Sequence, residues 1–317
     1  MAKTIGRLGY VGYGVESVAG TAVAASVYLP YSDGPSLMGK HEPLAITSGR
    51  TSRNIDADST VGKKWSEGDV QIDLDVVNSG YFFKVAFGNE MLATGTPNSH
   101  TFYTTVSGNT PKTATLIYGR DTDVEQYAYS AIDNLELNFS DGIATTKAAF
   151  KGKFPTTGAT QTATTTSGTV VTFKDANVYF GSTLTTAEAA SATAVNDFSI
   201  TFANNLEVIH QSGSADVAAI RTKGFKCSGT YTLFFDAETD KLAHQNLNKR
   251  ALEVVFTGNA NEQLRIRIPR FRLDEAEIST GLDDFFVVKG SFTAEDVVDS
   301  GARLVDLRLQ NSKGTVY

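Results

Sequence analysis

Strict alternation of apolar and polar residues is the feature that most constrains how this chain can fold. The clearest run spans residues 69–76. Its apolar members are Val70, Ile72, Leu74 and Val76, and its polar members are Asp69, Gln71, Asp73 and Asp75. A period of two puts the two sets on opposite faces of an extended strand. The sequence therefore predicts a strand with one buried face and one strongly acidic face.

The same period recurs elsewhere and predicts a strand at each place. The stretches are 135–139, 198–202, 230–235 and 264–268. Residues 140–142 read Ser-Asp-Gly, which is typical of a turn, so residues 143–154 are expected to return as a neighbouring strand. The 19 Phe, 12 Tyr and 28 Gly agree with this, because aromatic residues suit pleated surfaces and glycine punctuates them. We expect a mainly β fold, an antiparallel β-sandwich or barrel with one or two short helices.

Helix signals are few. Residues 236–250 carry a capping Asp236 at the start and Lys249 and Arg250 in the last turn, which suits the helix dipole. A second, shorter candidate is 80–87, which Gly88 would end. The sequence predicts a short helix in each stretch.

Composition excludes several classes of protein. The chain has 317 residues, of which 41% are hydrophobic and 20% charged, which is typical of a folded protein and not of a disordered one. No apolar run approaches the ~20 residues of a transmembrane helix, and the start lacks a signal-peptide run. The net charge of -7 argues against a general nucleic-acid binder. A single cysteine, Cys227, excludes an internal disulfide and a cysteine-cluster metal site.

The two halves of the sequence resemble each other. Residues 60–65 lead through Gly68 into one alternating strand, and residues 220–225 lead through Gly229 into another; a helix candidate follows each. We therefore expect two tandem units, with chance similarity between β-rich segments as the alternative. The expected division is an arm at 1–40, a first unit at 41–155, a connecting segment at 156–194, a second unit at 195–296 and a tail at 297–317.

Motifs that would carry chemistry are incomplete. The run Gly12-Tyr13-Gly14 begins like a dinucleotide fingerprint but lacks the third glycine and the strand and helix around it. The four histidines form no metal-binding pair, and the acidic pairs lack the spacing of a calcium loop. Cys227 has no local nucleophile signature. We expect no catalytic, cofactor or metal site, although the sequence alone does not exclude a pair of catalytic carboxylates.

Basic residues gather in two places that we interpret as contacts between subunits or between rings of subunits. One is the cluster Arg265, Arg267, Arg270 and Arg272, which holds only Phe271 as an aromatic residue and so lacks the stacking residues of a nucleic-acid groove. The other is the segment 47–66, expected as a long loop, with Arg50, Arg53, Lys63 and Lys64. A plain solvated face is the alternative for the arginine cluster.

Taken together, the chain resembles the tail tube (major tail) proteins of long-tailed bacteriophages. The opening run from Gly12 to Thr21 is similar to the family's "G-x-G-x-E-S-x-x-G-T" pattern. Residues 67–70 leading into a strand, residues 80–88 after it, and residues 100–102 are similar to further passages of the family. Residues 198–206 resemble its strand followed by "N-N-L". These motifs are spread over most of the chain in the family's order.

The resemblance implies a structural protein of the virion, not an enzyme, with no cofactor. Its fold would be a small β-sandwich flanked by a helix. Copies would close into rings whose inner strands form a continuous barrel, and stacked rings would form the hollow tube through which DNA is ejected. Relatives with two units per chain close with three copies, and others with six; the internal similarity favours three here. The implied partners are a tape-measure protein, a tail terminator and distal tail proteins, and assembly would take place in the host cytoplasm.

The lumen of such a tube must let a polyanion pass. A basic lining would bind DNA tightly through counterion release, whereas an acidic one would repel it. We therefore predict that Asp69, Gln71, Asp73 and Asp75, or their counterparts in the second unit, face the lumen. Burial of Asp73 and Asp75 would contradict this prediction. Alternatives for the whole chain are another β-rich virion or surface structural protein such as a shell or fibre component, a β-sandwich hydrolase, and a carbohydrate-binding module.

Overall fold

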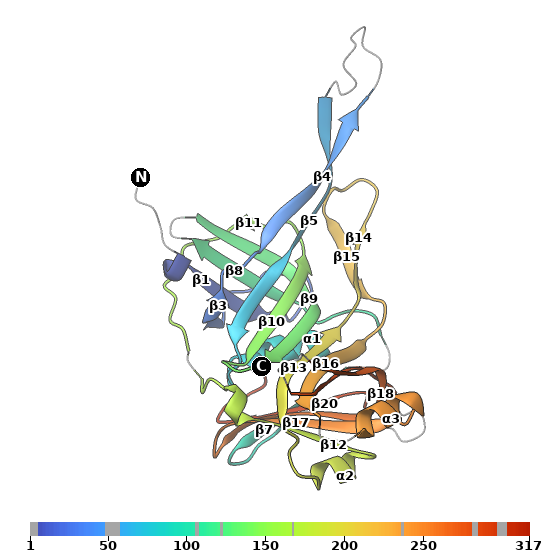
Figure 1. Cartoon of the computed structure of the whole chain (residues 1–317). Helices are drawn as coiled ribbons and strands as arrows, with labels where there is room; N and C mark the ends of the chain where they lie inside the picture. Colours follow the sequence, from blue (N-terminus) through green and yellow to red (C-terminus); the bar gives the residue numbers. More distant parts are fainter. Residues whose placement is uncertain are drawn as a thin grey trace.

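The computed structural model describes residues 6–47, 58–104, 108–120, 123–166, 168–235, 238–280, 285–296 and 303–317. The fold is mainly β, built from antiparallel strand pairs with a few short helices, which confirms the predicted fold class (Figure 1). The predicted strands at 135–139, 198–202, 230–235 and 264–268 are present, apart from Phe235, which follows its strand.

The strands and helices of the first half are as follows. The strands are β1 (Tyr10–Val15), β2 (Val27–Leu29), β3 (Tyr31–Asp33), β4 (Met38–Ile46), β5 (Asp58–Asp73), β6 (Asn89–Ala93), β7 (Asn98–Tyr103), β8 (Ala114–Arg120), β9 (Asp123–Phe139), β10 (Thr145–Gly152) and β11 (Thr156–Thr157). The helix α1 spans Ser79–Phe87, and a 3-10 turn spans Gly6–Leu8.

The second half follows a similar course. Its strands are β12 (Ala176–Gly181), β13 (Val195–Ala203), β14 (Leu206–His210), β15 (Val217–Thr222), β16 (Lys226–Phe234), β17 (Arg250–Asn259), β18 (Glu262–Ser279), β19 (Val287–Ala294) and β20 (Asp306–Asn311). Its helices are α2 (Leu184–Glu188) and α3 (Thr239–Gln245), and a 3-10 turn spans Phe173–Asp175.

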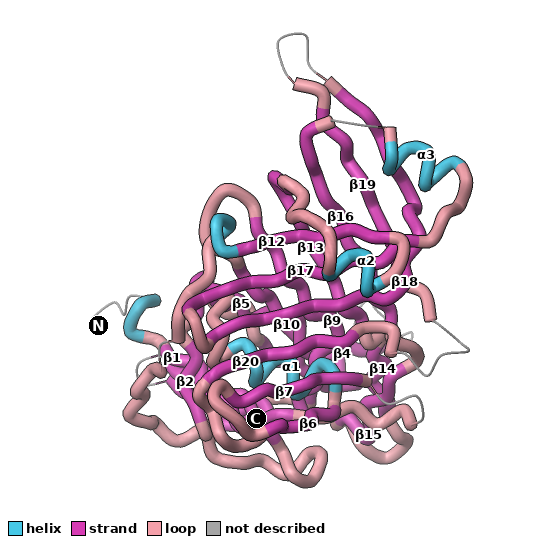
Figure 2. Tube along the Cα trace, turned by 90° about the horizontal axis from the view of Figure 1, so that it is seen from below, coloured by secondary structure: helices cyan, strands magenta, loops and turns pink. Residues whose placement is uncertain are grey.

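One sheet runs through both halves of the molecule, and we call it the long sheet. From β3 and β4 at one edge it continues through β5, β10, the second part of β9, β13, β16 and β19 to the second part of β18. Figure 2 shows β16 and β19 side by side in this sheet. The pairing of β9 with β13 is the step that joins the first half to the second.

The strands β9 and β18 each belong to two sheets. The first part of β9 pairs with β8, which pairs with β1, while the first part of β18 pairs with β17, which pairs with β12. Each strand changes sheet close to a shift in its register. In β9 the shift lies opposite residues Ala149 and Phe150 of β10, and in β18 it lies between Leu273 and Glu275. An extra residue at such a point bends the strand, so each half closes into a sandwich.

The main hydrophobic cluster of the described residues includes residues of both halves, and a smaller second cluster lies around Tyr129 and Ile220. Helix α1 contributes Phe82 and Phe83, both fully buried. At the joint between the halves, the ring of Phe139 packs against those of Phe198 and Phe256, with centroids 5.4 and 5.6 Å away. The two halves are therefore packed together as well as hydrogen-bonded.

The two helix predictions fare differently. The helix at 80–87 is confirmed as α1, and Gly88 ends it with a φ of 81° that favours glycine. The helix predicted at 236–250 is shorter, because Leu247 adopts a left-handed φ of 52° and Arg250 already begins β17. The expected capping residue Asp236 lies outside the described residues.

The segments expected as arm, loop and tail lie in sheets over much of their length. Strand β1 is paired on both sides, with β2 and β8, and its Tyr13 is fully buried. Residues 58–66 are not a loop but the first part of β5, which forms a long ribbon with β4 that projects beyond the sheets (Figure 1). In the expected tail, β20 pairs with β18 on one side and β7 on the other.

Candidate functional site: the polar face of the long sheet

The long sheet buries one side and presents the other, which we call the polar face. The polar residues of successive strands lie on the same side of the sheet, because the strand registers place polar residues opposite each other. Gln71 lies opposite Lys147, and Asn138 lies opposite Ser199. The polar face consists of Asp69, Gln71, Asp73, Thr145, Lys147, Asn134, Glu136, Asn138, Ser199, Thr201, Ser228, Thr230, Thr232, Lys289, Ser291, Thr293, Glu275, Glu277 and Ser279. None of these residues is buried.

Among the residues named, carboxylates outnumber lysines and lie mainly towards the two ends of the sheet, but the registers also place Lys226 and Arg272 on this side. The carboxylates are Asp69, Asp73, Glu136, Glu275 and Glu277, and they outnumber the ammonium groups of Lys147 and Lys289. Lys147 Nζ lies 3.0 Å from Asp69 Oδ2, and this hydrogen-bonded pair raises the pKa of the lysine. Between the ends, β13 and β16 present neutral hydroxyl groups. The second half thus provides threonines where the first has acidic groups.

Asp75 does not belong to the polar face, and its predicted exposure is wrong. It lies beyond the end of β5 and is only 2% exposed. Its Oδ1 accepts hydrogen bonds from the backbone N–H groups of Val77 (2.8 Å) and Asn78, and its Oδ2 accepts one from Asn78 Nδ2 (2.7 Å). Burial raises the pKa of Asp75 despite these hydrogen bonds. The carboxylate organises the turn that leads from β5 into α1.

The other three residues predicted for the acidic face lie on the exposed side of β5. Asp69, Gln71 and Asp73 are partly exposed on β5, while Val70 and Ile72 between them are fully buried. That these three residues line a lumen stays a prediction.

The lysines expected at a contact lie on the β4–β5 ribbon. Lys63 is exposed, and Lys64 Nζ lies 5.6 Å from the ring centroid of Phe154. The ribbon is supported by the neighbouring β14–β15 hairpin, because the Lys64 N–H donates to the Ala215 carbonyl oxygen at 2.8 Å. The other two residues of this set, Arg50 and Arg53, lie outside the described residues.

The arginine cluster is held by carboxylates of the same chain. Arg265 and Arg267 both contact Glu253, at 3.4 and 3.2 Å, and Arg267 also contacts Glu188 at 2.9 Å. These acidic partners neutralise much of the positive charge on the first part of β18.

The other two arginines are paired as well. Arg270 lies 3.4 Å from Glu295, and Arg272 lies 2.7 Å from Asp274. Hydrogen bonds from Lys249 and Arg272 hold the pKa of Glu295 below its usual range. All four arginines therefore have acidic partners within the same chain. A contact of the cluster with an acidic surface of another subunit stays a prediction.

Glu16, the glutamate of the run from Gly12 to Thr21, has a structural role that the sequence analysis did not predict. It is 1% exposed, and its carboxylate accepts hydrogen bonds from Thr113 and Thr115 hydroxyls and from the N–H groups of Gly20 and Tyr129, all within 2.8 Å. These bonds hold the chain after β1 against β8 and β9. The signal was present in the sequence, since a lone acidic residue directly follows an apolar strand.

The glycines of the Gly12-Tyr13-Gly14 run serve close packing. A Cβ atom on Gly12 would lie 2.8 Å from Ala25 Cβ, and one on Gly14 would lie 2.4 Å from the Ala24 carbonyl oxygen. Only glycine lets residues 24 and 25 approach β1 so closely. These glycines are explained by packing without a bound nucleotide.

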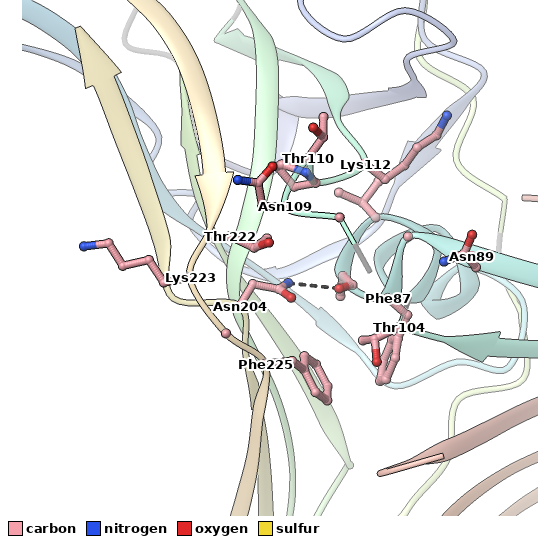
Figure 3. A pocket seen from close by; sticks show the side chains of 16 residues that line it. Phe87, Asn89, Thr104, Asn109, Thr110, Lys112, Asn204, Thr222, Lys223 and Phe225 are labelled. Atoms are coloured by element: carbon pink, nitrogen blue, oxygen red, sulfur yellow. Dashed lines mark hydrogen bonds between the residues drawn. The ribbon is translucent and has the colours of Figure 1, made fainter. Parts of the chain in front are cut away.

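A pocket of about 430 Å³ lies between the end of α1, residues 108–112 and residues 222–225 (Figure 3). At its floor Asn204 Nδ2 donates to the Ala86 carbonyl oxygen at 2.9 Å. Burial, with a contribution from Lys84, lowers the pKa of Lys112 at the rim. Its described lining contains no carboxylate, histidine, cysteine or serine, so it offers no acid–base pair or nucleophile of these types. Within the described ranges, no cluster of three His, Cys, Asp or Glu residues is arranged to hold a metal ion.

Comparisons with known proteins point to one family. The family model described as phage tail tube protein matches residues 6–300, which is nearly the whole chain. No curated protein matches the sequence. Among the helices of the described part of the chain, none is long and apolar enough to cross a membrane.

Proposed function

The chain belongs to the phage tail tube protein family, and from that premise we propose that its copies close into rings that stack into the hollow tube through which DNA is ejected. The family is structural, and membership makes the chain a self-assembling component of the virion tail. It also favours a tube over the shell or fibre component that the sequence left as an alternative.

The continuous polar face is the observation that carries the ring proposal. It crosses both halves of the molecule without interruption, because β9 and β13 pair in register across the joint. A sheet with two open edges exposes unpaired backbone groups, which favours pairing with another chain. Closing the sheet on itself through neighbouring copies would remove both edges and place one side of every copy on the bore.

The chemistry of the polar face supports its placement on the bore. Phosphate groups would meet carboxylates and hydroxyls, and the few lysines include Lys147, which is already paired with Asp69. Such a lining releases few counterions on contact with DNA and so gives DNA little affinity for the wall. We propose Asp69, Gln71 and Asp73 as lumen residues of the first half, and Thr230 and Thr232 as those of the second.

The order of strand pairings supports two tandem units. In the first half β1 pairs with β8, β8 with β9, β9 with β10 and β10 with β5. In the second half β12 pairs with β17, β17 with β18, β18 with β19 and β19 with β16. Helices α1 and α3 follow β5 and β16 respectively. We propose that each half is one tube unit and that three copies close a ring.

The remaining partners follow from the role of a tube. We propose a tape-measure protein within the tube during assembly, a tail terminator at the end near the head, and distal tail proteins at the tip. Assembly in the host cytoplasm is part of the same proposal.

Electron microscopy of the concentrated purified protein tests the proposed function. Hollow tubes of constant bore are expected, and sedimentation should show their mass growing with protein concentration. Flat sheets, solid fibres or a species that stays monomeric at every concentration would contradict the proposal.

A further inference from the structure

The joint between the two halves has a defined register on the polar face. Across β9 and β13, Asn138 lies opposite Ser199, Glu136 opposite Thr201 and Asn134 opposite Ala203. Ser199 Oγ donates to Glu136 Oε1 at 3.2 Å. The inference that follows rests on the proposed function. If the strands of the two halves match one to one, this joint is a template for the contact between copies.

Two glycines fix that match. Gly68 of β5 lies opposite Phe150 of β10, and Gly229 of β16 lies opposite Phe292 of β19. In both halves the shift of register in the next strand falls beside this phenylalanine. The match therefore relates β5 to β16, β10 to β19, and the second part of β9 to the second part of β18.

The same match relates residues 36–40 to residues 199–203. Ser199 lies opposite Thr230 in β16. In the first half, the Ser36 N–H donates to the carbonyl oxygen of Asp69, the residue that corresponds to Thr230, at 3.0 Å. Leu37, like its counterpart Ile200, is buried on the core side. Residues 36–40 are thus the first-half counterpart of the strand that makes the joint.

Both partners of a second joint are present, although within residues 36–40 the Leu37 carbonyl oxygen already accepts one hydrogen bond, from Tyr127 Oη at 3.0 Å. In the described part of the chain, no strand pairs with the outer edge of residues 36–40 or with that of residues 275–279. Ile278 is partly exposed, whereas its counterpart Leu137, covered by the joint, is 1% exposed.

We propose that residues 275–279 of one copy pair antiparallel with residues 36–40 of the next copy, in the register of the joint between β9 and β13. This register places Ser279 opposite Ser36, Glu277 opposite Met38 and Glu275 opposite Lys40. Lys40 and Glu275 bring opposite charges together, and directly opposed pairs of this kind stabilise a sheet. Lys40 already lies beside Glu67 of its own copy, so in the proposed contact its ammonium group would lie between two carboxylates.

An aromatic cluster supports the same contact independently. Phe234, Phe235, Phe285 and Phe286 gather where β16 and β19 end, and Phe285 is 81% exposed. The matching end in the first half is covered, because Val171 donates its N–H to the Leu74 carbonyl oxygen and accepts from the Ala144 N–H. Val171 lies in the segment before β12, and the counterpart of β12 is β1. By the same match, we expect the described residues just before β1 of the next copy, residues 6–9, to approach the aromatic cluster.

Disulfide trapping tests the register. The pair Met38→Cys and Glu277→Cys is introduced after Cys227→Ala, which removes the buried native thiol. Facing positions on neighbouring antiparallel strands have Cβ atoms as close as about 4.5 Å, a separation that a disulfide spans. Mild oxidation of assembled tubes should give covalent dimers and trimers on non-reducing gels. The control pair Met38→Cys and Ala276→Cys places the thiols on opposite faces and should stay uncoupled.

A charge swap tests the same contact without new thiols. Lys40→Glu and Glu275→Lys should each raise the protein concentration needed for assembly, by roughly two- to ten-fold for a pair of exposed charges. The double swap should reverse part of the effect, because Lys40→Glu also removes the ion pair with Glu67 of the same copy. Lys174→Glu, at another exposed lysine, should leave assembly unchanged.

The two tests separate this proposal from the function beneath it. Tubes that form normally but show no preference for the Met38–Glu277 pair, and no recovery in the double swap, would overturn the register and leave the tube function standing. An intact protein that never assembles would overturn the proposed function itself. For the aromatic cluster, Phe285→Ser should weaken assembly without lowering the melting temperature, and normal assembly would contradict its burial by the next copy.

Discussion

The rings of Phe139 and Phe198 stack across the joint between the two halves, with centroids 5.4 Å apart and planes inclined by 19°. Phe139 ends β9 and Phe198 lies in β13, so the stack closes the core at the point where two distant parts of the chain begin to share one sheet. The polar face is continuous across both halves because they are joined here.

Phe139→Ala should therefore destabilise the whole molecule. Removal of a buried ring leaves a cavity and costs about 3–5 kcal/mol in the free energy of unfolding. Chemical denaturation of the monomer measures this loss. Phe173→Ala is the matched control, because Phe173 is 51% exposed and should change stability little. Equal effects of the two substitutions would show that the joint does not contribute to stability.

Gly68→Ala should also destabilise the fold, through backbone strain and crowding. Gly68 has a φ of 150°, and a Cβ atom there would lie 2.5 Å from the Ser36 carbonyl oxygen. Crowding of this kind costs typically about 1–3 kcal/mol. Gly142→Ala, at a position with open space, should be close to neutral. If the two alanine variants unfold at the same denaturant concentration, the close approach of residue 36 to β5 is not required.

Acid should weaken the attachment of the C-terminal residues through Glu90. Burial alone would raise the pKa of Glu90, but hydrogen bonds from His100, Lys84 and the Tyr317 N–H outweigh it, and the net pKa is lowered. A lowered folded-state pKa gives stability that is present above the ordinary value of 4.5 and is lost as the pH falls through the folded-state value.

Melting temperatures of the wild type and Glu90→Gln check this sign. The variant should be less stable at neutral pH, and the difference should shrink as the pH falls below the ordinary value of 4.5 and the wild-type carboxylate is protonated. Glu238→Gln, at an exposed glutamate paired with Lys241, should show almost no difference at either pH. A Glu90→Gln deficit that stays constant with pH would contradict the ionised role of Glu90.

Reversing charge on the polar face should make the bore bind DNA. Asp73→Lys is expected to leave folding and assembly intact, because Asp73 is partly exposed at the end of β5. Assembled tubes should then retain duplex DNA at low salt and release it as salt rises, since each added lysine releases counterions. Asp123→Lys, at an exposed position in the first part of β9, serves as the control. DNA retention that is the same in both variants would place Asp73 outside the bore.

Many of the strands could be predicted from the alternation of apolar and polar residues. Burial of one face of a sheet makes every second residue of a strand apolar. The strand at 69–76 shows where this signal fails. Leu74 and Val76 are buried as predicted, yet the strand ends at Asp73 and Asp75 turns inward to cap the approach to α1. Alternating burial continues through such a turn, so the pattern cannot distinguish it from a strand.

Long-range pairings escaped sequence reasoning for a different reason. Glu188 lies 79 residues before Arg267, and Glu295 lies 25 residues after Arg270, and nothing local marks them as partners. The same is true of β20, which pairs with β7 although some two hundred residues separate them. Such contacts depend on the topology of the whole sheet, which alternation in single strands does not specify.

A helical reconstruction of the assembled tube by electron microscopy tests the central claim most directly. The account predicts rings of three copies, each contributing two similar lobes, with Asp69, Asp73 and Thr230 lining the bore and residues 275–279 paired with residues 36–40 of the next copy. Rings of six copies, or a polar face turned to the outside of the tube, would contradict it.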